Sequence, residues 1–220
     1  QIQGVHGAGH VDGHLDGGAV LTLVALVGWL AWGGGVSARH PAATATPTLQ
    51  TTTVFQLPWG DGAQALGRRP AAESAPEGPH SFAVAVDGRV FVLDQVNHRV
   101  LVVGPGGATQ SVSLPSDTYQ DIAVGPGDRL WAVDRLVQGH VALRRGAADW
   151  RFAPVLGPGL PAGGGISALF ARRDGVWLEW AHTHQVRVAD AEGRPDARRP
   201  QLWGRPTADG AGLIRAVRVS

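Results

Sequence analysis

The sequence predicts an all-β fold, a β-propeller-like array of about three to four four-stranded blades preceded by one apolar helix. The first observation is a set of three short apolar segments in residues 78–103, separated by turn residues. The second is that this pattern returns about forty residues later and again, less clearly, about 86 residues later. A repeat of about 40 to 45 residues is typical of four-stranded propeller blades. The third is the abundance of turn formers, 32 Gly and 15 Pro in 220 residues, which favours short strands over long helices.

The first repeat has the layout of a three-strand meander. It predicts apolar strands at 82–86, 89–93 and 99–103. Asp87 and Gly88 form the turn between the first two strands, because Asp-Gly is a strong hairpin signal. A polar corner at 94–98 separates the second strand from the third.

Residues at matching places identify the second and third repeats. The second has Arg129, Leu130, Trp131 and Asp134 where the first has Arg89, Val90, Phe91 and Asp94. The third has Val176, Trp177 and His184 where the first has Val90, Phe91 and His98. We expect Asp94 and Asp134 to accept hydrogen bonds from the backbone of their corners, as short polar residues do at turns.

The first repeat resembles the NHL repeat, which is named after an Asn-His-Leu motif at its corner. The resemblance rests on Gly78-Pro79, the segment from Phe82 to Asp94, and Asn97-His98-Arg99-Val100. It covers about residues 78–190 and is clearest in the first repeat. It implies a propeller, usually of about six blades, that serves as a scaffold for protein or other ligands. Some propellers related to this type are lyases or lactone hydrolases that bind a metal near the central channel.

The chain before the repeats divides into three parts. Residues 1–18 are expected to be a flexible leader rich in Gly and His, because the glycines oppose the helix that would align His6, His10 and His14 around a metal. Residues 19–38 are expected to be a transmembrane helix or a signal segment, with a buried core helix as the third alternative. Residues 39–50, rich in Pro, Ala and Thr, are expected to be a linker.

The propeller is expected to occupy residues 51–220. Residues 51–57 favour a strand that closes the array against its last blade, and 59–77 favour a surface loop. Residues 213–219 favour one strand of a fourth blade. Either the array is incomplete or further blades pair with it, because propellers generally need about four or more blades to close.

Composition excludes several classes of function. The 19 basic and 18 acidic residues nearly cancel, so no global field favours nucleic acid. Cysteine is absent, which excludes disulfides and thiolate chemistry. No phosphate loop, dinucleotide fingerprint or nucleophile elbow is present, and no catalytic residue is assigned. The Arg-rich segment 194–205 favours a solvated loop over a site for an acidic partner.

Candidate ligand-binding residues are those whose side chains suit recognition at a loop or corner. They are Trp59, Arg89, Asn97, His98, Arg129 and Trp180. No cofactor is expected, although a divalent metal is an alternative. His182 and His184 alternate, so on a strand both would point to one face, where Glu179 or Asp174 is near. The competing interpretation is a polar strand end at the propeller rim.

These observations predict an extracytoplasmic bacterial propeller that binds a protein or cell-surface ligand without catalysis. The expected location is the cell membrane facing the periplasm or exterior, with contact to the membrane through residues 19–38, or the secreted fraction. One alternative is a metal-dependent propeller hydrolase or lyase that uses His182 and His184. Another is a structural subunit of a membrane assembly.

Overall fold

The computed structural model describes residues 20–26, 51–137, 139–161, 165–206 and 213–215. Over these residues the protein consists of β-strands joined by turns and loops, with one short 3-10 turn, η1 (Gln95–Asn97). Three four-stranded antiparallel sheets dominate the structure, and we name them blades I, II and III in chain order. The all-β, propeller-like part of the prediction is therefore confirmed.

Each blade runs from its innermost to its outermost strand in chain order. Blade I contains β3 (Phe82–Val84), β4 (Val90–Asp94), β5 (Arg99–Val103) and β6 (Thr109–Ser113). Blade II contains β7 (Asp121–Gly125), β8 (Arg129–Asp134), β9 (His140–Arg145) and β10 (Arg151–Pro154). Blade III contains β11 (Ile166–Arg172), β12 (Gly175–Trp180), β13 (His184–Asp190) and β14 (Gln201–Trp203). In blade I, β3 ends two residues earlier than predicted, β4 is shifted by one residue, and β5 is as predicted.

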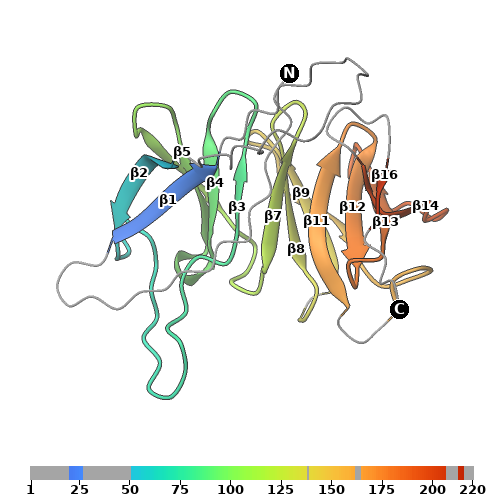
Figure 1. The fold of residues 1–220 in the computed structure, drawn as a ribbon, viewed down its shortest axis with the longest axis horizontal. Helices are drawn as coiled ribbons and strands as arrows, with labels where there is room; N and C mark the ends of the chain where they lie inside the picture. Colours follow the sequence, from blue (N-terminus) through green and yellow to red (C-terminus); the bar gives the residue numbers. More distant parts are fainter. Residues whose placement is uncertain (1–19, 27–50, 138, 162–164, 207–212, 216–220) are drawn as a thin grey trace, which may run out of the picture.

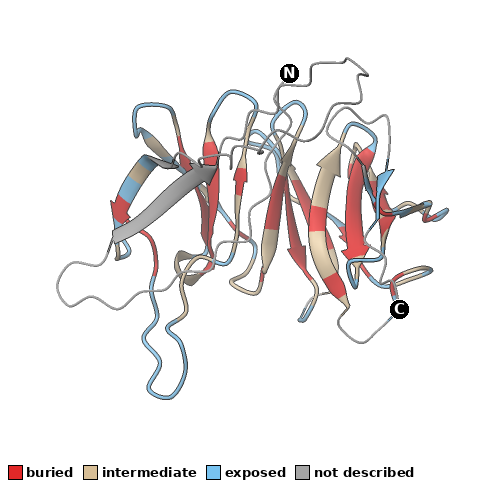
Figure 2. Ribbon diagram, viewed as in Figure 1, coloured by how far each residue is buried: buried red, intermediate tan, exposed pale blue. Residues whose placement is uncertain are grey.

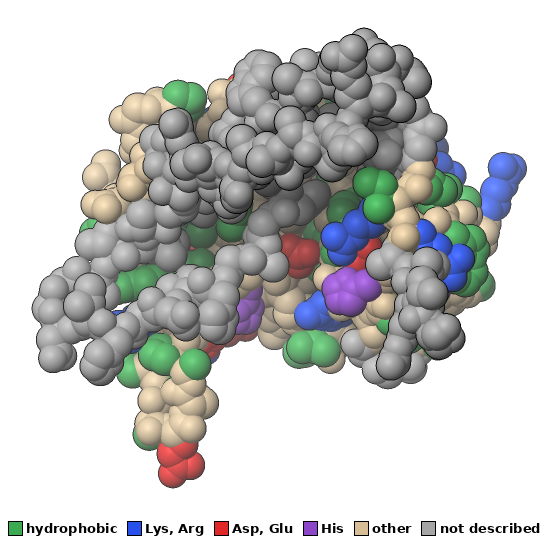
Figure 3. All heavy atoms as spheres, viewed as in Figure 1, with side chains coloured by type: hydrophobic (Ala, Val, Ile, Leu, Met, Phe, Trp, Pro, Cys, Tyr) green, Lys and Arg blue, Asp and Glu red, His purple; other side chains and the backbone are tan. Residues whose placement is uncertain are grey.

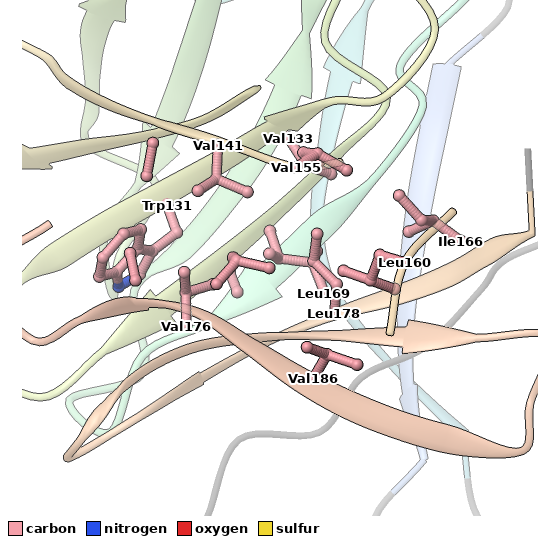
Figure 4. Close-up of a cluster of buried hydrophobic side chains, with 14 of the residues drawn as sticks. Trp131, Val133, Val141, Val155, Leu160, Ile166, Leu169, Val176, Leu178 and Val186 are labelled. Atoms are coloured by element: carbon pink, nitrogen blue, oxygen red, sulfur yellow. The ribbon is translucent and has the colours of Figure 1, made fainter. Parts of the chain in front are cut away.

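The innermost strands β3, β7 and β11 lie side by side, and each blade continues away from them (Figure 1). Buried residues gather in the middle strands of the blades (Figure 2). One apolar cluster fills the space between blades II and III, where Trp131, Val141, Leu178 and Val186 meet (Figure 4). A second cluster joins blades I and II. The alternation of apolar residues along each strand produces both interfaces, because successive side chains point to opposite faces of a sheet.

The blades are stacked in the same orientation, so that equivalent turns lie at the same end. Arg89, in the β3–β4 turn, forms an ion pair with Asp128, in the β7–β8 turn. Arg145, at the end of β9, reaches Glu192 in the β13–β14 turn at 3.3 Å. We name this end of the molecule the turn end. The opposite end, which carries the β4–β5, β8–β9 and β12–β13 connections, is named the corner end.

The predicted apolar helix is wrong for the part of it that the structure describes. Val20–Leu26 forms strand β1, which pairs antiparallel with β2 (Thr51–Pro58). The segment Val-Leu-Thr-Leu-Val contains residues that favour strands. For a short apolar run, hydropathy alone cannot distinguish a buried strand from a buried helix. Within the described ranges no helix has the length and apolar character needed to span a membrane. The predicted leader 1–18, the rest of the predicted helix and the linker 39–50 lie outside the described residues.

The sequence suggested that residues 51–57 close the array against its last blade, but strand β2 lies elsewhere. Its Leu57 is buried with Val90, Val92 and Leu101 of blade I, so β2 covers the free face of the first blade. At the other end of the array, β15 (Arg205–Pro206) pairs with β16 (Leu213–Ile214). The described part of the predicted strand 213–219 therefore pairs with β15.

Candidate ligand-binding site

The β12–β13 corner of blade III is a tight turn with an uncommon backbone conformation. Trp180 and His184 lie opposite each other at the strand ends, and the Thr183 N–H donates a hydrogen bond of 2.8 Å to the Trp180 carbonyl. The two central residues, Ala181 and His182, have φ values of 47° and 56°. A four-residue β-turn with positive φ at both central positions favours Asn-Gly or Gly-Gly there. Here, two residues with a Cβ occupy them, which is unfavourable and needs support from the surroundings.

Two hydrogen bonds hold His182 in this turn. Its backbone N–H donates to Ser167 Oγ at 3.1 Å, and its Nδ1 lies 3.1 Å from Glu179 Oε2. A carboxylate only accepts hydrogen bonds, so Nδ1 carries the ring proton and Nε2 keeps a lone pair in the neutral imidazole. The side chain is 73% exposed, so the imidazole is oriented by the protein and accessible from solvent.

Glu179 is the buried charge around which the site is organised. Its side chain is 2% exposed, and Arg205 donates to both of its oxygens, from Nε at 2.6 Å and from Nη2 at 2.7 Å. Ser167 Oγ donates a third hydrogen bond at 2.8 Å. The hydrogen bonds from Arg205, assisted by Ser167, hold the pKa of the Glu179 carboxyl below its usual value against the opposing effect of burial. The same pair raises the pKa of Arg205. The carboxylate is therefore anionic at neutral pH.

Glu179 stands at a position that is aliphatic in the other two blades. The register places the pair Glu179 and Gln185 of blade III where blade I has Leu93 and Val100 and blade II has Val133 and Val141. Those aliphatic residues pack against the following blade. In blade III the same face carries guanidinium groups over aromatic rings, with Arg172 4.7 Å from the Trp177 ring centre and Arg205 5.7 Å from that of Phe170. The sequence therefore makes the outer face of blade III a polar surface that carries guanidinium groups.

A pocket of about 320 Å³ opens beside this corner, and we name it the blade III pocket. It is lined by His182, Gly204, Arg205, Ile214 and Arg215. Gly204 has a φ of 110°, and a Cβ there would lie 2.7 Å from the Ile214 carbonyl oxygen, so a side chain would force β15 and β16 apart. Figure 3 shows acidic, basic and histidine side chains gathered over β7, β11 and β12 on the face that Figure 1 presents.

The pocket carries a net positive charge. Arg205 is neutralised by Glu179, whereas Arg215 forms no ion pair within the described part of the chain. The Arg215 guanidinium instead lies 5.7 Å from the ring centre of Trp203, and Trp203 is 54% exposed. This arrangement positions one uncompensated cation, an oriented imidazole and the apolar Ile214 side chain around one cavity.

The two candidate metal ligands, His182 and His184, each contact other groups in the structure. His182 lies in the turn rather than on a strand, so the alternation expected for His182 and His184 does not apply. His184 Nδ1 is 2.9 Å from Thr183 Oγ1, and its Nε2 is 3.1 Å from the Gly159 carbonyl oxygen. The described residues contain no group of three or more His, Asp or Glu that could hold a metal ion.

Three candidate ligand-binding residues lie at or near the corner of blade I. Asn97 donates to the Gly60 carbonyl and to Asp94 Oδ2, both at 2.9 Å, so its amide ties the loop that begins at Trp59 to the corner. Trp59 is half-buried against blade I. His98 has a φ of 53° and an exposed side chain. These residues do not line the blade III pocket.

The remaining candidates lie elsewhere in the blades. Arg89 is bound to Asp87 and Asp128 at the turn end, and Arg129 starts β8 at the same end. Trp180 is half-buried and packs against the cluster between blades II and III. The eight candidates are thus spread over three regions, and only His182 lines the blade III pocket.

Several residues of the site were missed by the sequence analysis. Arg205 belongs to the segment interpreted as a solvated loop, and Ile214 and Arg215 carried no signal. Ser167 stands at the repeat position of Ser81 and Asp121, and this match of polar residues before or at an innermost strand is a signal that could have identified it. The predicted role is confirmed for Asp134, which accepts from the backbone of Leu136 and Val137. Asp94 instead accepts from the backbone N–H of Gly67, outside its corner, and from the side chains of Asn97 and Arg99.

Comparisons with known proteins do not assign the chain to a family. No family model matches the sequence, so the NHL resemblance is not confirmed, and no curated protein matches it. Among solved structures, a streptogramin B lyase has a TM-score of 0.42 and 14% identity over 57% of this chain and 41% of that one. Selenomethionine-substituted virginiamycin B lyase from Staphylococcus aureus has a TM-score of 0.43 and 13% identity over 65% of this chain and 52% of that one.

A catalytically inactive variant of the Staphylococcus aureus virginiamycin B lyase, with quinupristin, has a TM-score of 0.43 and 10% identity. That likeness covers 73% of this chain and 61% of the other. The chain thus spans less than two thirds of each of these proteins.

Proposed function

We propose that the protein is a non-catalytic β-propeller binding module whose blade III pocket receives an anionic group of a protein or cell-surface ligand. The observation that carries the proposal is the pocket itself, in which Arg215 is unpaired in the described part of the chain beside the oriented imidazole of His182. A guanidinium recognises carboxylate and phosphate oxygens through charge-assisted hydrogen bonds, and the His182 imidazole donates such a bond from Nε2 when that nitrogen is protonated.

The chemistry of the pocket narrows the class of ligand. Ile214 is 66% exposed and lines one wall, so the anionic group of the ligand is accompanied by an apolar part. A volume of about 320 Å³ accommodates a side chain or a chain terminus rather than a whole macromolecule. The ligand therefore inserts one such group while the rest of it contacts the surrounding surface of blade III.

Backbone strain supports a functional role for His182. A positive φ at a residue other than Gly costs about 1 kcal/mol or more, and Ala181 and His182 adopt it in succession. Asn-Gly would form the same turn without this cost. The side chain held in this strained position lines the blade III pocket, which supports a role for it in binding.

A matched pair of probes tests the proposal. Isothermal titration calorimetry compares 4-phenylbutyrate, which carries a carboxylate and an apolar body, with 4-phenylbutanamide, which has the same skeleton without the charge. We expect saturable binding of the carboxylate and at least about tenfold weaker binding of the amide, because a charge-assisted hydrogen bond contributes about 1.5 to 3 kcal/mol. Equal affinities, or no saturable binding of either probe, would refute the proposed site.

A second candidate function is proton transfer to or from a bound ligand. The contact of His182 Nδ1 with Glu179 leaves Nε2 as a proton acceptor beside the pocket, which is the arrangement of a general base. The metal-dependent form of this alternative requires His182 and His184 to share an ion. Metal content measured on the wild-type protein and on the double variant His182→Ala, His184→Ala tests it, and an unchanged metal content would reject it.

The location of the protein stays a proposal. We propose that it meets its ligand outside the cytoplasm, at the membrane surface or in the secreted fraction. The argument from an apolar helix no longer supports this location, because Val20–Leu26 is a strand. Fractionation of the native host, followed by detection of the protein in each fraction, tests it.

A further inference from the structure

A second pocket, distinct from the blade III pocket, lies between blades II and III at the turn end, and we name it the blade II–III pocket. Its volume is about 320 Å³. Its floor is the buried side chain of Leu143. Around it stand five charged residues: Arg145, Asp149, Arg151, Glu192 and Arg194.

The start of β10 directs two of these charges toward the pocket. Trp150 faces blade I, where its Nε1 donates to the Ser113 carbonyl at 3.1 Å and its ring stacks on Tyr119 with centres 6.4 Å apart. Arg151 begins β10 and Asp149 precedes the strand, and the side chains of both line the pocket. Arg151 lies directly opposite Leu143 in the strand register.

The blade III side of the pocket is a turn fixed by its own hydrogen bonds. Asp190 Oδ1 accepts from the backbone N–H groups of Glu192 and Arg194, both at 2.9 Å. Gly193 has a φ of 80°, and a Cβ there would lie 2.9 Å from Leu143 Cδ2. The turn therefore packs so closely on Leu143 that only a glycine fits at position 193. Its hydrogen bonds fix the blade III wall of the pocket before a ligand binds.

Pairing among the five charges leaves one cation and one anion without partners. Arg145 lies 3.3 Å from Glu192 Oε1 and donates to the Ala191 carbonyl at 2.8 Å. Arg194 lies 3.9 Å from Asp190 Oδ2. Within the described ranges, the Arg151 and Asp149 side chains form neither an ion pair nor a hydrogen bond, although both line the same pocket.

We propose that the blade II–III pocket binds a small zwitterion, in which a carboxylate is paired by Arg151 and a protonated amine by Asp149. A free amino acid or a short peptide with both termini charged has this chemistry. Arg151 suits the carboxylate because a guanidinium can donate two parallel hydrogen bonds to it. The neutralised Arg145–Glu192 and Arg194–Asp190 pairs form the rim and do not compete for the ligand. This inference does not depend on the function proposed for the blade III pocket.

Calorimetric titration of the whole protein with three related peptides tests the charge requirement. Glycylglycine carries both charges, N-acetylglycylglycine only the carboxylate, and glycylglycinamide only the ammonium group. We expect saturable binding of glycylglycine and at least about tenfold weaker binding of the other two, because each loses one charge-assisted contact.

Variants locate the binding. Arg151→Gln and Asp149→Asn each lower the affinity for glycylglycine by at least about tenfold. Both side chains are exposed, so these variants keep the fold, which circular dichroism verifies. Arg173→Gln, at the exposed β11–β12 turn, leaves this affinity unchanged. Absence of saturable binding, equal binding of a singly charged peptide, or undiminished binding by the two pocket variants would overturn the proposal.

Discussion

Ser81 Oγ donates a hydrogen bond of 2.5 Å to Asp121 Oδ1 and so joins blade I to the innermost strand of blade II. The other oxygen of Asp121 accepts from the backbone N–H of Leu169 in blade III at 3.2 Å. A single carboxylate thus links all three blades at the side where β3, β7 and β11 lie next to one another (Figure 1).

Asp121→Ala should therefore destabilise the whole array. It removes the acceptor of the Leu169 N–H and of Ser81, and each hydrogen bond lost to a charged group costs about 1.5 to 3 kcal/mol. We expect the free energy of unfolding in urea to fall by about 3 kcal/mol or more. Asp149→Ala, at an exposed position, is the matched control, with a change within about 0.5 kcal/mol. Equal effects of the two substitutions would contradict this role of Asp121.

Glu179 should make the protein sensitive to acid. Its pKa in the folded state lies below the unfolded value, chiefly because of the hydrogen bonds from Arg205. Its contribution to stability is present above the unfolded pKa of about 4.3 and is lost as the pH falls through the folded pKa. Urea midpoints measured between about pH 6 and pH 3 should fall with decreasing pH. Glu179→Gln should be less stable at pH 6 and should show a smaller fall. An identical pH profile for both proteins would exclude Glu179 as a source of the dependence.

His140 should add a second, separate pH dependence at higher pH. Burial lowers its pKa, its Nε2 lies 2.8 Å from the Tyr119 hydroxyl, and its ring meets the edge of Phe152. Because its folded pKa is below the unfolded value of about 6.5, stability declines as the pH falls below that value and levels off below the folded pKa. His140→Gln, which keeps an acceptor for the tyrosine, should remove the decline between about pH 7 and pH 5. Persistence of the full decline in this variant would show that another group causes it.

The β12–β13 turn should be more stable without its histidine. In the double variant Ala181→Asn, His182→Gly, residues suited to positive φ replace two that are not. We expect the free energy of unfolding to rise by about 1 kcal/mol, while affinity for 4-phenylbutyrate falls. A loss of stability would show that the hydrogen bond of His182 with Glu179 outweighs the strain. An unchanged affinity for 4-phenylbutyrate would show that His182 does not take part in binding.

The middle strands of the blades were predictable because they depend on local signals. Val90–Asp94 and Arg99–Val103 are apolar runs of strand length bounded by an Asp-Gly turn and a polar corner, so composition and turn chemistry agree. The strand Val20–Leu26 was not predictable in this way. Its apolar character fits a helix equally well, and its partner in the sheet lies about thirty residues further along the chain.

The candidate site depends on contacts between segments that the sequence alone does not place together. Glu179 and His182 are three residues apart, and their proximity was anticipated. The Glu179–Arg205 pair forms because β14, just before Arg205, pairs with β13, which lies beside Glu179. No residue near Arg205 in the sequence signals this contact. Similarly, Arg215 reaches the pocket through the pairing of β16 with β15. His182 was placed on a strand, since the alternation of two histidines resembles strand periodicity even though the first of them lies in the turn.

The most direct test of anion binding at the blade III pocket is a titration of two arginine variants with 4-phenylbutyrate. Arg215→Gln removes the cation that is unpaired in the described part of the chain, whereas Arg173→Gln removes an exposed cation outside the pocket. We predict that the affinity of Arg215→Gln falls by about tenfold or more, and that Arg173→Gln binds as the wild-type protein does. Equal affinities of the two variants would contradict the proposed site.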